Sequence, residues 1–381
     1  MPEGRRLGFQ RHEPATDADP TTMGAEPGPG ALPTLDDRAA AALLPARPAR
    51  AHKGTFGKVL VIAGSLDYAG AALLVCRSAG RAGAGLVTLA IPESLQPLFA
   101  AKVVEATTMA LPEDDVEEVD PEPALARILD HDHDALVLGP GLRPGLATAE
   151  LVRELLHAPG EPTGESAVEP TGESAEPRSD GRSGGQGHNP PIVLDAEALR
   201  SMATLGAWWE GATRPCVLTP HPGEFARLRE GAGIEAGADG DLAGDDAARA
   251  AAALDAARSW GQVVILKGAR TVIAEPDGSG AVLPFENPAL ATGGTGDVLA
   301  GIVGALLAQG LAPGAAARLG AYLHGLAGEA VRERIGDAGL LASDLPDAIP
   351  MVRKRLAAIA DRDRSGKRLG FGVREPDGAT A

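Results

Sequence analysis

NPALATGGTGDVLAG, residues 287–301, is the most informative stretch for the fold of this 381-residue chain. It joins a glycine-rich turn, 293–296, to an acidic residue and an apolar run typical of a buried helix. Such a turn leaves backbone N–H groups unpaired at a helix N-terminus, where the helix dipole adds partial positive charge. We therefore predict an anion hole, with phosphate as the expected occupant, at Gly294, Thr295 and Gly296.

Asp297 follows this turn directly. A carboxylate beside a bound phosphate is unfavourable unless it takes part in chemistry, and a base aimed at an acceptor hydroxyl is such a role. The alternative is structural: Asp297 caps a helix over 298–309, and the glycines form only a turn. Asp297 is thus a candidate catalytic base, with the capping role left open.

Outward from this stretch, short β-branched runs alternate with longer segments rich in Ala and Leu. Most of the short runs are continuously apolar, as expected for strands buried on both faces. We predict strands at 58–63, 86–91, 135–138, 192–194, 216–219, 263–266 and 271–274. Helices are predicted at about 69–83, 147–157, 196–204, 222–229, 245–259, 295–309, 314–335 and 343–360. The order predicts an α/β fold with a mostly parallel central sheet, helices on both faces, and ligands beyond the carboxyl ends of the strands.

Three segments depart from this pattern. Residues 1–33 and 362–381 are polar and without periodicity, which predicts disorder. Residues 158–191 contain EPTGESA twice, at 161–167 and at 169–175, within Pro-, Gly- and Ser-rich sequence. We interpret this segment as an inserted surface loop. The remainder, 34–361, is expected to form one large domain.

The charge balance narrows the class of partner. Lys and Arg total 35 against 52 Asp and Glu, a net charge of −17, which disfavours nucleic acid and anionic membranes as partners. The two cysteines, Cys76 and Cys216, lie in apolar runs without metal-ligand spacing, as in proteins of a reducing compartment. No apolar segment resembles a secretory signal or reaches the length of a membrane helix, so we expect a cytoplasmic protein that binds small molecules.

Turns after the predicted strands supply further candidate contacts. In GSLDYAGAALL, 64–74, small residues at a helix start allow either a flat ligand or close helix packing. LGPGL, 138–142, forces a tight turn where a backbone contact to substrate is expected, although such turns are also common loops. Asp195, at the tip of 192–194, could order water around a metal or cap the next helix.

Two later motifs carry polar side chains to strand ends. LTPHPGEFARL, 218–228, holds His221 on a stiff loop between prolines, where a substrate contact and a structural role are both open. In VVILKGARTVIAEPDG, 263–278, Lys267 could neutralise a nucleotide phosphate with Thr271 as hydrogen-bond partner, or could be an exposed cation on a hairpin. Two phosphate-type features favour a nucleotide. A Walker A sequence and a dinucleotide-binding fingerprint are both absent.

Taken together, these motifs resemble the ADP/ATP-dependent NAD(P)H-hydrate dehydratase family, which has a ribokinase-like fold. The resemblance runs from about 40 to 355, interrupted at 158–191, and rests on HKGTFGKVLVIAGS, GAALL, RAGAGLVTLA, LGPGL, LDAEAL, LTPHPGE, LKGARTVI and NPALATGGTGDVLAG. It implies a repair reaction in which the C6 hydroxyl of the S epimer of hydrated NADH or NADPH is phosphorylated and phosphate is then eliminated. Bacterial members typically use ADP and release AMP, with Mg²⁺ bridging phosphate oxygens.

The family's contacts carry over position by position. The resemblance implies that Asp297 is the base and that the hydrate contacts Ala71, Gly141, His221 and Asp297. The adenine nucleotide, ADP or ATP, would contact Lys267, Gly268, Ala269, Arg270, Thr271 and Gly296. No metal ligand is assigned. A homo-oligomer is plausible by resemblance alone, and a separate NAD(P)H-hydrate epimerase would act on the same pool, because no segment resembles that enzyme.

Departures and competing hypotheses remain. The family commonly has Gly-Asn-Pro-Gly before the turn, whereas Glu286 precedes Asn287 here and Ala289 and Leu290 follow Pro288. The long insertion is also unusual. One alternative is a ribokinase-like kinase for a sugar, vitamin or pyrimidine alcohol, and another is a nucleotide-binding protein without turnover. The acidic residue after an intact glycine turn argues against the second alternative.

Overall fold

The computed structural model describes residues 32–115, 117–159, 189–234, 242 and 244–368. The chain divides into two units, 1–31 and 32–381, and all described residues lie in the second. The predicted disordered N-terminus and inserted loop lie almost wholly outside the described residues, as does 369–381. The last helix, α11 (Leu345–Arg368), continues seven residues beyond the predicted domain end at 361. At the other boundary, the Pro33 carbonyl accepts a hydrogen bond from the N–H of Val282.

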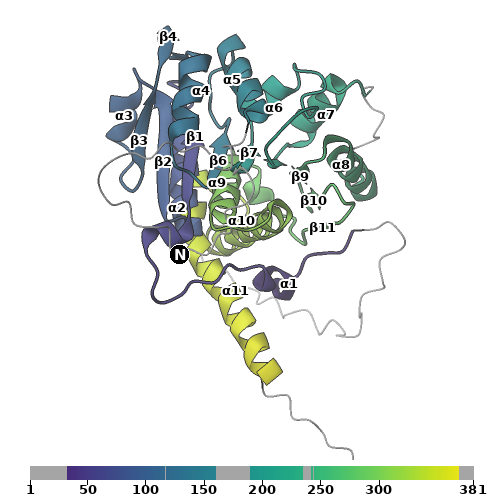
Figure 1. Ribbon diagram of the computed structural model, residues 1–381. Helices are drawn as coiled ribbons and strands as arrows, with labels where there is room; N and C mark the ends of the chain where they lie inside the picture. Colours follow the sequence, from purple (N-terminus) through teal and green to yellow (C-terminus); the bar gives the residue numbers. More distant parts are fainter. Residues whose placement is uncertain (1–31, 116, 160–188, 235–241, 243, 369–381) are drawn as a thin grey trace, which may run out of the picture. The chain divides into compact units, whose positions relative to one another are not determined.

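The described residues form one nine-stranded sheet in the order β11-β10-β9-β8-β7-β6-β1-β2-β3 (Figure 1). All seven predicted strands are present: β1 (Lys58–Ile62), β2 (Leu86–Pro92), β6 (Ala135–Leu138), β7 (Ile192–Leu194), β8 (Cys216–Leu218), β9 (Val263–Leu266) and β10 (Val272–Ala274). Pairing is parallel from β3 through to β9, and β10 is antiparallel to both of its neighbours. The predicted mostly parallel α/β fold is confirmed.

The strands that the sequence did not reveal are the two edges of this sheet and a small separate hairpin. They are β3 (Thr107–Leu111), β11 (Gly280–Val282), β4 (Glu113–Asp115) and β5 (Glu118–Val119). An edge strand is partly solvated, so β3 alternates between buried and more exposed positions rather than forming an apolar run. The strand β11 has only three residues, one of them glycine, which gives too short a pattern to recognise.

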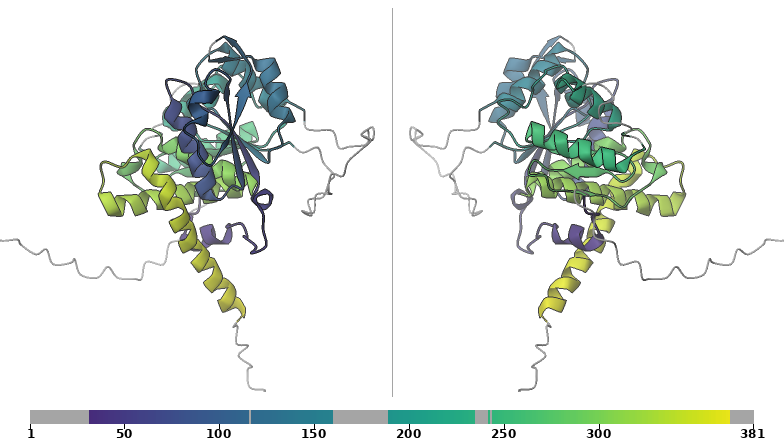
Figure 2. Two further views of the ribbon diagram at one scale, coloured as in Figure 1. Left: turned by 90° about the vertical axis from the view of Figure 1, so that its left-hand side faces the viewer. Right: turned by 90° about the vertical axis from the view of Figure 1, so that its right-hand side faces the viewer.

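Helices cover both faces of the sheet (Figure 2). Along β1, Val59 and Val61 face one helical layer, whereas Leu60 and Ile62 face the other. The first layer contains α1 (Asp37–Ala42), α2 (Ala69–Ala82), α9 (Thr295–Ala308), α10 (Pro313–Ile335) and α11. The second contains α4 (Pro121–Asp130), α5 (Leu146–His157), α6 (Glu197–Met202), α7 (Pro222–Gly231) and α8 (Asp246–Trp260). The short helix α3 (Gln96–Ala100) lies beside β3, and three 3₁₀ turns are η1 (Lys53–Phe56), η2 (Pro288–Leu290) and η3 (Ala342–Asp344).

The helix α9 is the most enclosed of these, since every residue from Val298 to Ala308 is buried. A helix that is apolar on all sides needs neighbours on all sides, and α9 packs between α2, α10 and the sheet. Among the described residues, no helix combines the length and the apolar character needed to cross a bilayer.

Gly139, at the carboxyl end of β6, has a φ of +119°, and a Cβ there would lie 2.0 Å from the carbonyl oxygen of Asp195. Gly139→Ala is therefore expected to lower the free energy of unfolding by about 3 kcal/mol, because backbone strain adds to a steric clash. Denaturant unfolding measures this. Gly206→Ala is the matched control: its φ is +65° with no atom within 4 Å of the added Cβ, so a loss of about 1 kcal/mol is expected. Equal losses in the two variants would contradict the clash.

Candidate functional site

The carboxyl ends of five parallel strands are tied to one another by backbone hydrogen bonds. The Asp195 N–H donates to the Leu138 carbonyl at 3.2 Å, and the Thr219 N–H donates to Leu194 at 3.1 Å. The Lys267 N–H donates to the Pro220 carbonyl at 2.8 Å. Gly64, after β1, donates to the carbonyl of Pro140 at 2.9 Å. The turns singled out in the sequence thus form one continuous polar rim.

The glycine turn enters α9 at this rim. Gly294 is the N-cap residue with a φ of +89°, and no side chain caps the helix. The helix begins at Thr295, which places Asp297 within its first turn. The interpretation of Asp297 as a cap for a helix starting at 298 is therefore wrong, and its carboxylate remains available for another role.

Thr295 is the anchor of the turn. Its hydroxyl lies 3.0 Å from the carbonyls of both Leu290 and Thr292, and its N–H donates to Thr292 at 3.4 Å. Its own carbonyl accepts from the ring of His324. The predicted anion hole remains a prediction. Within it, the N–H of Thr295 is already engaged, so Gly296 is the better-placed donor.

Lys267 joins the glycine turn to the strand ends. Its Nζ lies 2.9 Å from Oδ1 of Asp195 and 3.7 Å from Oε2 of Glu224. A Cβ at Gly296 would lie 3.3 Å from the same Nζ, so the ammonium group lies directly against the turn. The side chain of Lys267 is only 20% exposed. The interpretation of Lys267 as an exposed hairpin cation is therefore wrong.

Asp195 is buried and belongs to this network. Its Oδ1 accepts from the hydroxyl of Thr219 at 2.8 Å as well as from Lys267. The helix that follows has Ala196 as its N-cap and no side-chain cap, which removes the capping role considered for Asp195. Its carboxylate is only 3% exposed, so the ammonium group of Lys267 is its main charge compensation among the described residues.

The electrostatics of this network favour a base near neutral pH. Burial raises the pKa of Asp297 to about 7, with the negative charge of Asp195 adding to the rise and Lys267 opposing it. Burial by itself lowers the pKa of Lys267, but the nearby carboxylates, Asp195 foremost and then Glu224, raise it by more. Lys267 is thus a cation, and Asp297 changes its charge close to physiological pH.

His221 is the N-cap of α7. Its Nδ1 accepts from the N–H groups of Gly223 and Glu224 at 3.1 and 3.3 Å, while Glu224 accepts from the His221 N–H at 2.9 Å. This capping box orients the imidazole, whose side chain remains 52% exposed, and also orients Glu224 towards Lys267. A substrate contact through the other ring nitrogen of His221 stays a prediction.

Ala71 and Gly141, the other two predicted substrate contacts, lie next to each other. Gly141 has a φ of +66°, and a Cβ there would lie 2.7 Å from Cβ of Ala71 and 2.8 Å from the carbonyl of Tyr68. The small residues therefore permit close packing of α2 against the turn after β6. The substrate contact at these two residues stays a prediction.

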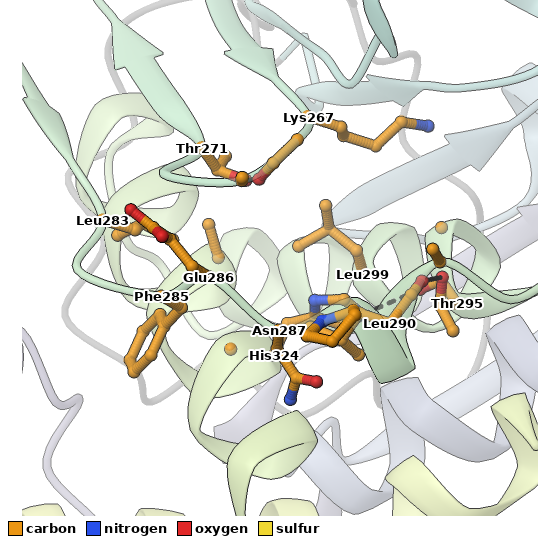
Figure 3. Close-up of a pocket in the computed structure, with 17 residues that line it drawn as sticks. Lys267, Thr271, Leu283, Phe285, Glu286, Asn287, Leu290, Thr295, Leu299 and His324 are labelled. Carbon is orange, nitrogen blue, oxygen red and sulfur yellow. Dashed lines mark hydrogen bonds between the residues drawn. The ribbon is translucent and has the colours of Figure 1, made fainter. Parts of the chain in front are cut away.

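A cavity of about 540 Å³ opens beside the glycine turn (Figure 3). Five of the six predicted nucleotide contacts line it: Lys267, Gly268, Ala269, Thr271 and Gly296. The sixth, Arg270, is directed elsewhere, since its Nε lies 2.7 Å from Oδ2 of Asp246. Thr295, predicted as part of the anion hole, also lines the cavity. The sequence did not reveal the remaining lining residues, which are Leu283, Phe285, Glu286, Asn287, Pro288, Leu290, Ala291, Leu299, Ala321, His324 and Gly325.

No pattern in the sequence could have assigned most of those residues to the cavity. Arg249 was missed for the same reason: it lies on α8 and donates to the carbonyls of Leu266, Lys267 and Ala269, which fixes the loop above the cavity. Its role depends on a contact between segments about 20 residues apart. Among the described residues, no group of three His, Cys, Asp or Glu side chains is arranged to hold a metal ion.

The fold and the rim define a ribokinase-like α/β protein. A ribokinase-like superfamily protein from Enterococcus faecalis superposes with a TM-score of 0.62 at 23% identity, covering 86% of this chain and 96% of that one. The chain belongs to the NAD(P)H-hydrate dehydratase family, whose model matches residues 59–159 and 186–351.

Individual relatives agree with this assignment. The chain is 35% identical over 321 residues to an ADP-dependent (S)-NAD(P)H-hydrate dehydratase of Xanthomonas campestris, covering 83% of this chain and 96% of that protein. A crystal structure of the ADP/ATP-dependent NAD(P)H-hydrate dehydratase of Bacillus subtilis, co-crystallised with ATP and Mg²⁺, gives a TM-score of 0.65 at 31% identity. It covers 85% of this chain and 99% of that one.

Other relatives are longer. The bifunctional NAD(P)H-hydrate repair enzyme of Moorella thermoacetica is 41% identical over 316 residues, covering 82% of this chain but 52% of that protein. The chain thus spans about half the length of several curated relatives that it matches.

Proposed function

We propose that this protein is an ADP-dependent (S)-NAD(P)H-hydrate dehydratase, which restores NADH or NADPH from the hydrated form and releases AMP and phosphate. The observation that carries the proposal is the placement of Asp297. Its carboxylate lies in the first turn of α9, in a network with Lys267 and Asp195, beside a cavity large enough for a nucleotide. Membership of the family and a similarity that covers 96% of the length of the Xanthomonas campestris enzyme, at 35% identity, support the substrate.

Different residues of the chain act on the nucleotide and on the hydrate. In the proposed mechanism, Asp297 takes the proton of the C6 hydroxyl as that oxygen attacks the terminal phosphorus of the nucleotide. The N–H groups of the glycine turn and the ammonium of Lys267 offset charge on the transferring phosphoryl group. Ala71, Gly141 and His221 would position the hydrate. The ring nitrogen next to C6 then expels phosphate, and loss of a proton from C5 reforms the C5–C6 double bond. This is chemistry of the substrate that the protein only has to orient.

Mg²⁺ fits this rim as an ion carried by the nucleotide. Three carboxylates, Asp195, Glu224 and Asp297, interact with the single ammonium group of Lys267, so the surplus of negative charge suits a divalent cation. Two of those carboxylates are already within 4 Å of Lys267, so we assign no protein ligand. Bound mainly through phosphate oxygens, Mg²⁺ would neutralise charge on the transferring group.

The direct test is a spectrophotometric assay. Purified protein with hydrated NADH, Mg²⁺ and ADP should restore the absorbance band of reduced nicotinamide, and a parallel reaction with ATP decides the donor. Absence of recovery with either donor would contradict the proposal. A stable phosphorylated alcohol, formed without dehydration, would favour the small-molecule kinase. We further propose that an NAD(P)H-hydrate epimerase supplies the S epimer in the cytoplasm, and that the dehydratase assembles as a homo-oligomer.

The dehydratase activity should depend on pH through Asp297. Because the pKa of its carboxyl is about 7 and only the carboxylate is a base, kcat/KM is expected to rise as pH increases through about 7. The effect on stability has the opposite sign. A raised pKa favours the protonated folded state, so this contribution is complete below the unfolded pKa of 3.8 and is lost as pH rises through about 7. A kcat/KM that stays flat between about pH 5.5 and 8.5 would contradict the assignment.

A further inference from the structure

A hydrogen bond to the backbone fixes the tautomer of His324, which lies on α10. Its Nε2 lies 2.9 Å from the carbonyl oxygen of Thr295, and a carbonyl can only accept, so Nε2 carries the hydrogen. Burial, with the charge of Lys267 adding to it, lowers the pKa of the ring to about 4 despite the hydrogen bond to Thr295. The imidazole is therefore neutral, which leaves Nδ1 as a bare acceptor. Within the described part of the chain, no hydrogen bond is made to Nδ1.

Asn287 presents no free donor to the cavity. Its Oδ1 accepts from the N–H of Ala289 at 2.9 Å, which fixes the orientation of the amide. Its Nδ2 is buried, and no acceptor for it is present among the residues that the structure describes. Because Nδ2 has almost no accessible surface and the cavity is wide enough for water, Nδ2 does not face a ligand in that cavity. Asn287 and His324 both line the cavity of about 540 Å³.

The imidazole of His324 lies in the part of the cavity away from the ammonium group of Lys267 (Figure 3). Side chains that line this part are largely apolar and include those of Phe285, Leu290 and Leu299. Gly325 allows the ring of Phe285 to pack directly against the backbone of α10, since a Cβ at this position would lie 2.2 Å from that ring. With phosphates at Lys267 and the glycine turn, an apolar region with one free acceptor, Nδ1 of His324, is left for the flat base.

We propose that Nδ1 of His324 recognises the purine of the phosphoryl donor and favours adenine nucleotides. The inference rests on the proposed function in placing a nucleotide in this cavity. The C6 amino group of adenine donates to Nδ1. In hypoxanthine and guanine, C6 carries an oxygen that only accepts, so two acceptors would face each other at Nδ1. A site built for one hydrogen-bond pattern rejects the other because a buried group is left unpaired.

The test compares ADP with IDP, which differ only in the C6 group and the proton on the adjacent ring nitrogen. Dissociation constants are measured by calorimetry with Mg²⁺ and without the hydrated substrate. The wild-type protein is expected to bind ADP roughly 10- to 100-fold more tightly than IDP. Equal affinities, a preference for IDP, or failure to bind either nucleotide would overturn the proposal.

Two substitutions of His324 separate base recognition from structure. In His324→Gln, the side-chain amide can take the place of Nε2 and keep the bond to Thr295, but the acceptor at Nδ1 is lost. In His324→Asn, the side-chain oxygen can take the place of Nδ1, but the bond to Thr295 is lost. We expect His324→Gln to reduce the ADP preference over IDP to about threefold or less, and His324→Asn to retain most of it with weaker affinity for both nucleotides. Full discrimination in His324→Gln, with a normal thermal transition, would overturn the role of Nδ1.

Failure of the adenine recognition and failure of the proposed dehydratase activity give different experimental results. Selective binding of ADP without recovery of reduced nicotinamide would remove the dehydratase assignment and leave the reading of adenine intact. Recovery of reduced nicotinamide at equal rates with ADP and IDP would support the dehydratase assignment and overturn the recognition of adenine. For this second readout, both nucleotides are compared at concentrations below their dissociation constants, so that the rate reports discrimination between them.

Discussion

Asp297→Asn is expected to lower turnover by about two to four orders of magnitude while nucleotide affinity changes little. The amide keeps the size and position of the side chain in the first turn of α9 but cannot accept a proton from an incoming hydroxyl. Nucleotide affinity should persist because the cavity is lined by other residues, including Lys267 and Gly296. Steady-state rates of dehydration, together with calorimetric titration with ADP, measure the two quantities separately.

The same variant carries an internal check on its folding. Since the raised pKa of Asp297 disfavours the charged folded state, Asp297→Asn should be more stable than the wild type above pH 7 and should differ less at pH 4. Asp130→Asn, which alters an exposed carboxylate at the end of α4, is the matched control and should leave turnover unchanged. Near-normal turnover in Asp297→Asn would refute Asp297 as the base, whatever its effect on stability.

Lys267→Met is expected to lower the free energy of unfolding by about 3 kcal/mol, because it leaves the buried carboxylate of Asp195 without its cation. Glu224, 3.7 Å from the same ammonium group, adds a second uncompensated charge. Nucleotide affinity should also fall, by about tenfold or more, if Lys267 neutralises a phosphate. Urea denaturation at pH 8 and calorimetry with ADP measure the two effects.

Two further variants test the cause of that loss. Lys267→Met combined with Asp195→Asn should recover much of the stability, since neither charge of the pair then remains, whereas the nucleotide affinity should stay low. Lys58→Met removes an exposed ion pair with Asp132 at the amino end of β1 and should cost less than about 1 kcal/mol. If the double variant were less stable than Lys267→Met alone, burial of an unpaired charge would not be the cause.

The central strands and their turns were predictable because burial on both faces leaves a local pattern. Runs such as Val263–Leu266 are apolar at every position, and the glycine turn at 293–296 has a composition that few other structures require. The edge strands β3 and β11 were missed because partial solvation or shortness removes that pattern. The helices α1, α3 and α4 were missed as well, and the first two have only six and five residues.

The candidate site shows the same division. Lys267, Gly296 and Asp297 each stand in a motif that indicates phosphate chemistry by itself, so the sequence alone could name them. Arg270 has the same neighbours in sequence, yet its side chain pairs with Asp246 rather than facing the cavity. No local pattern distinguishes these two outcomes, because a side chain's partner on another element is not encoded in its own segment.

Sequence by itself determined the parallel α/β architecture, the glycine turn and the acidic residue that follows it, because each depends on residues close together in the chain. Only the tertiary structure decided how those parts act on one another. It brought the carboxylates of Asp195 and Glu224, from two other segments, to within 4 Å of the ammonium group of Lys267, and it buried Asp297 beside them. Charge coupling and desolvation depend on distances in space, so the raised pKa of Asp297 and the free acceptor on His324 become visible only once the chain has folded.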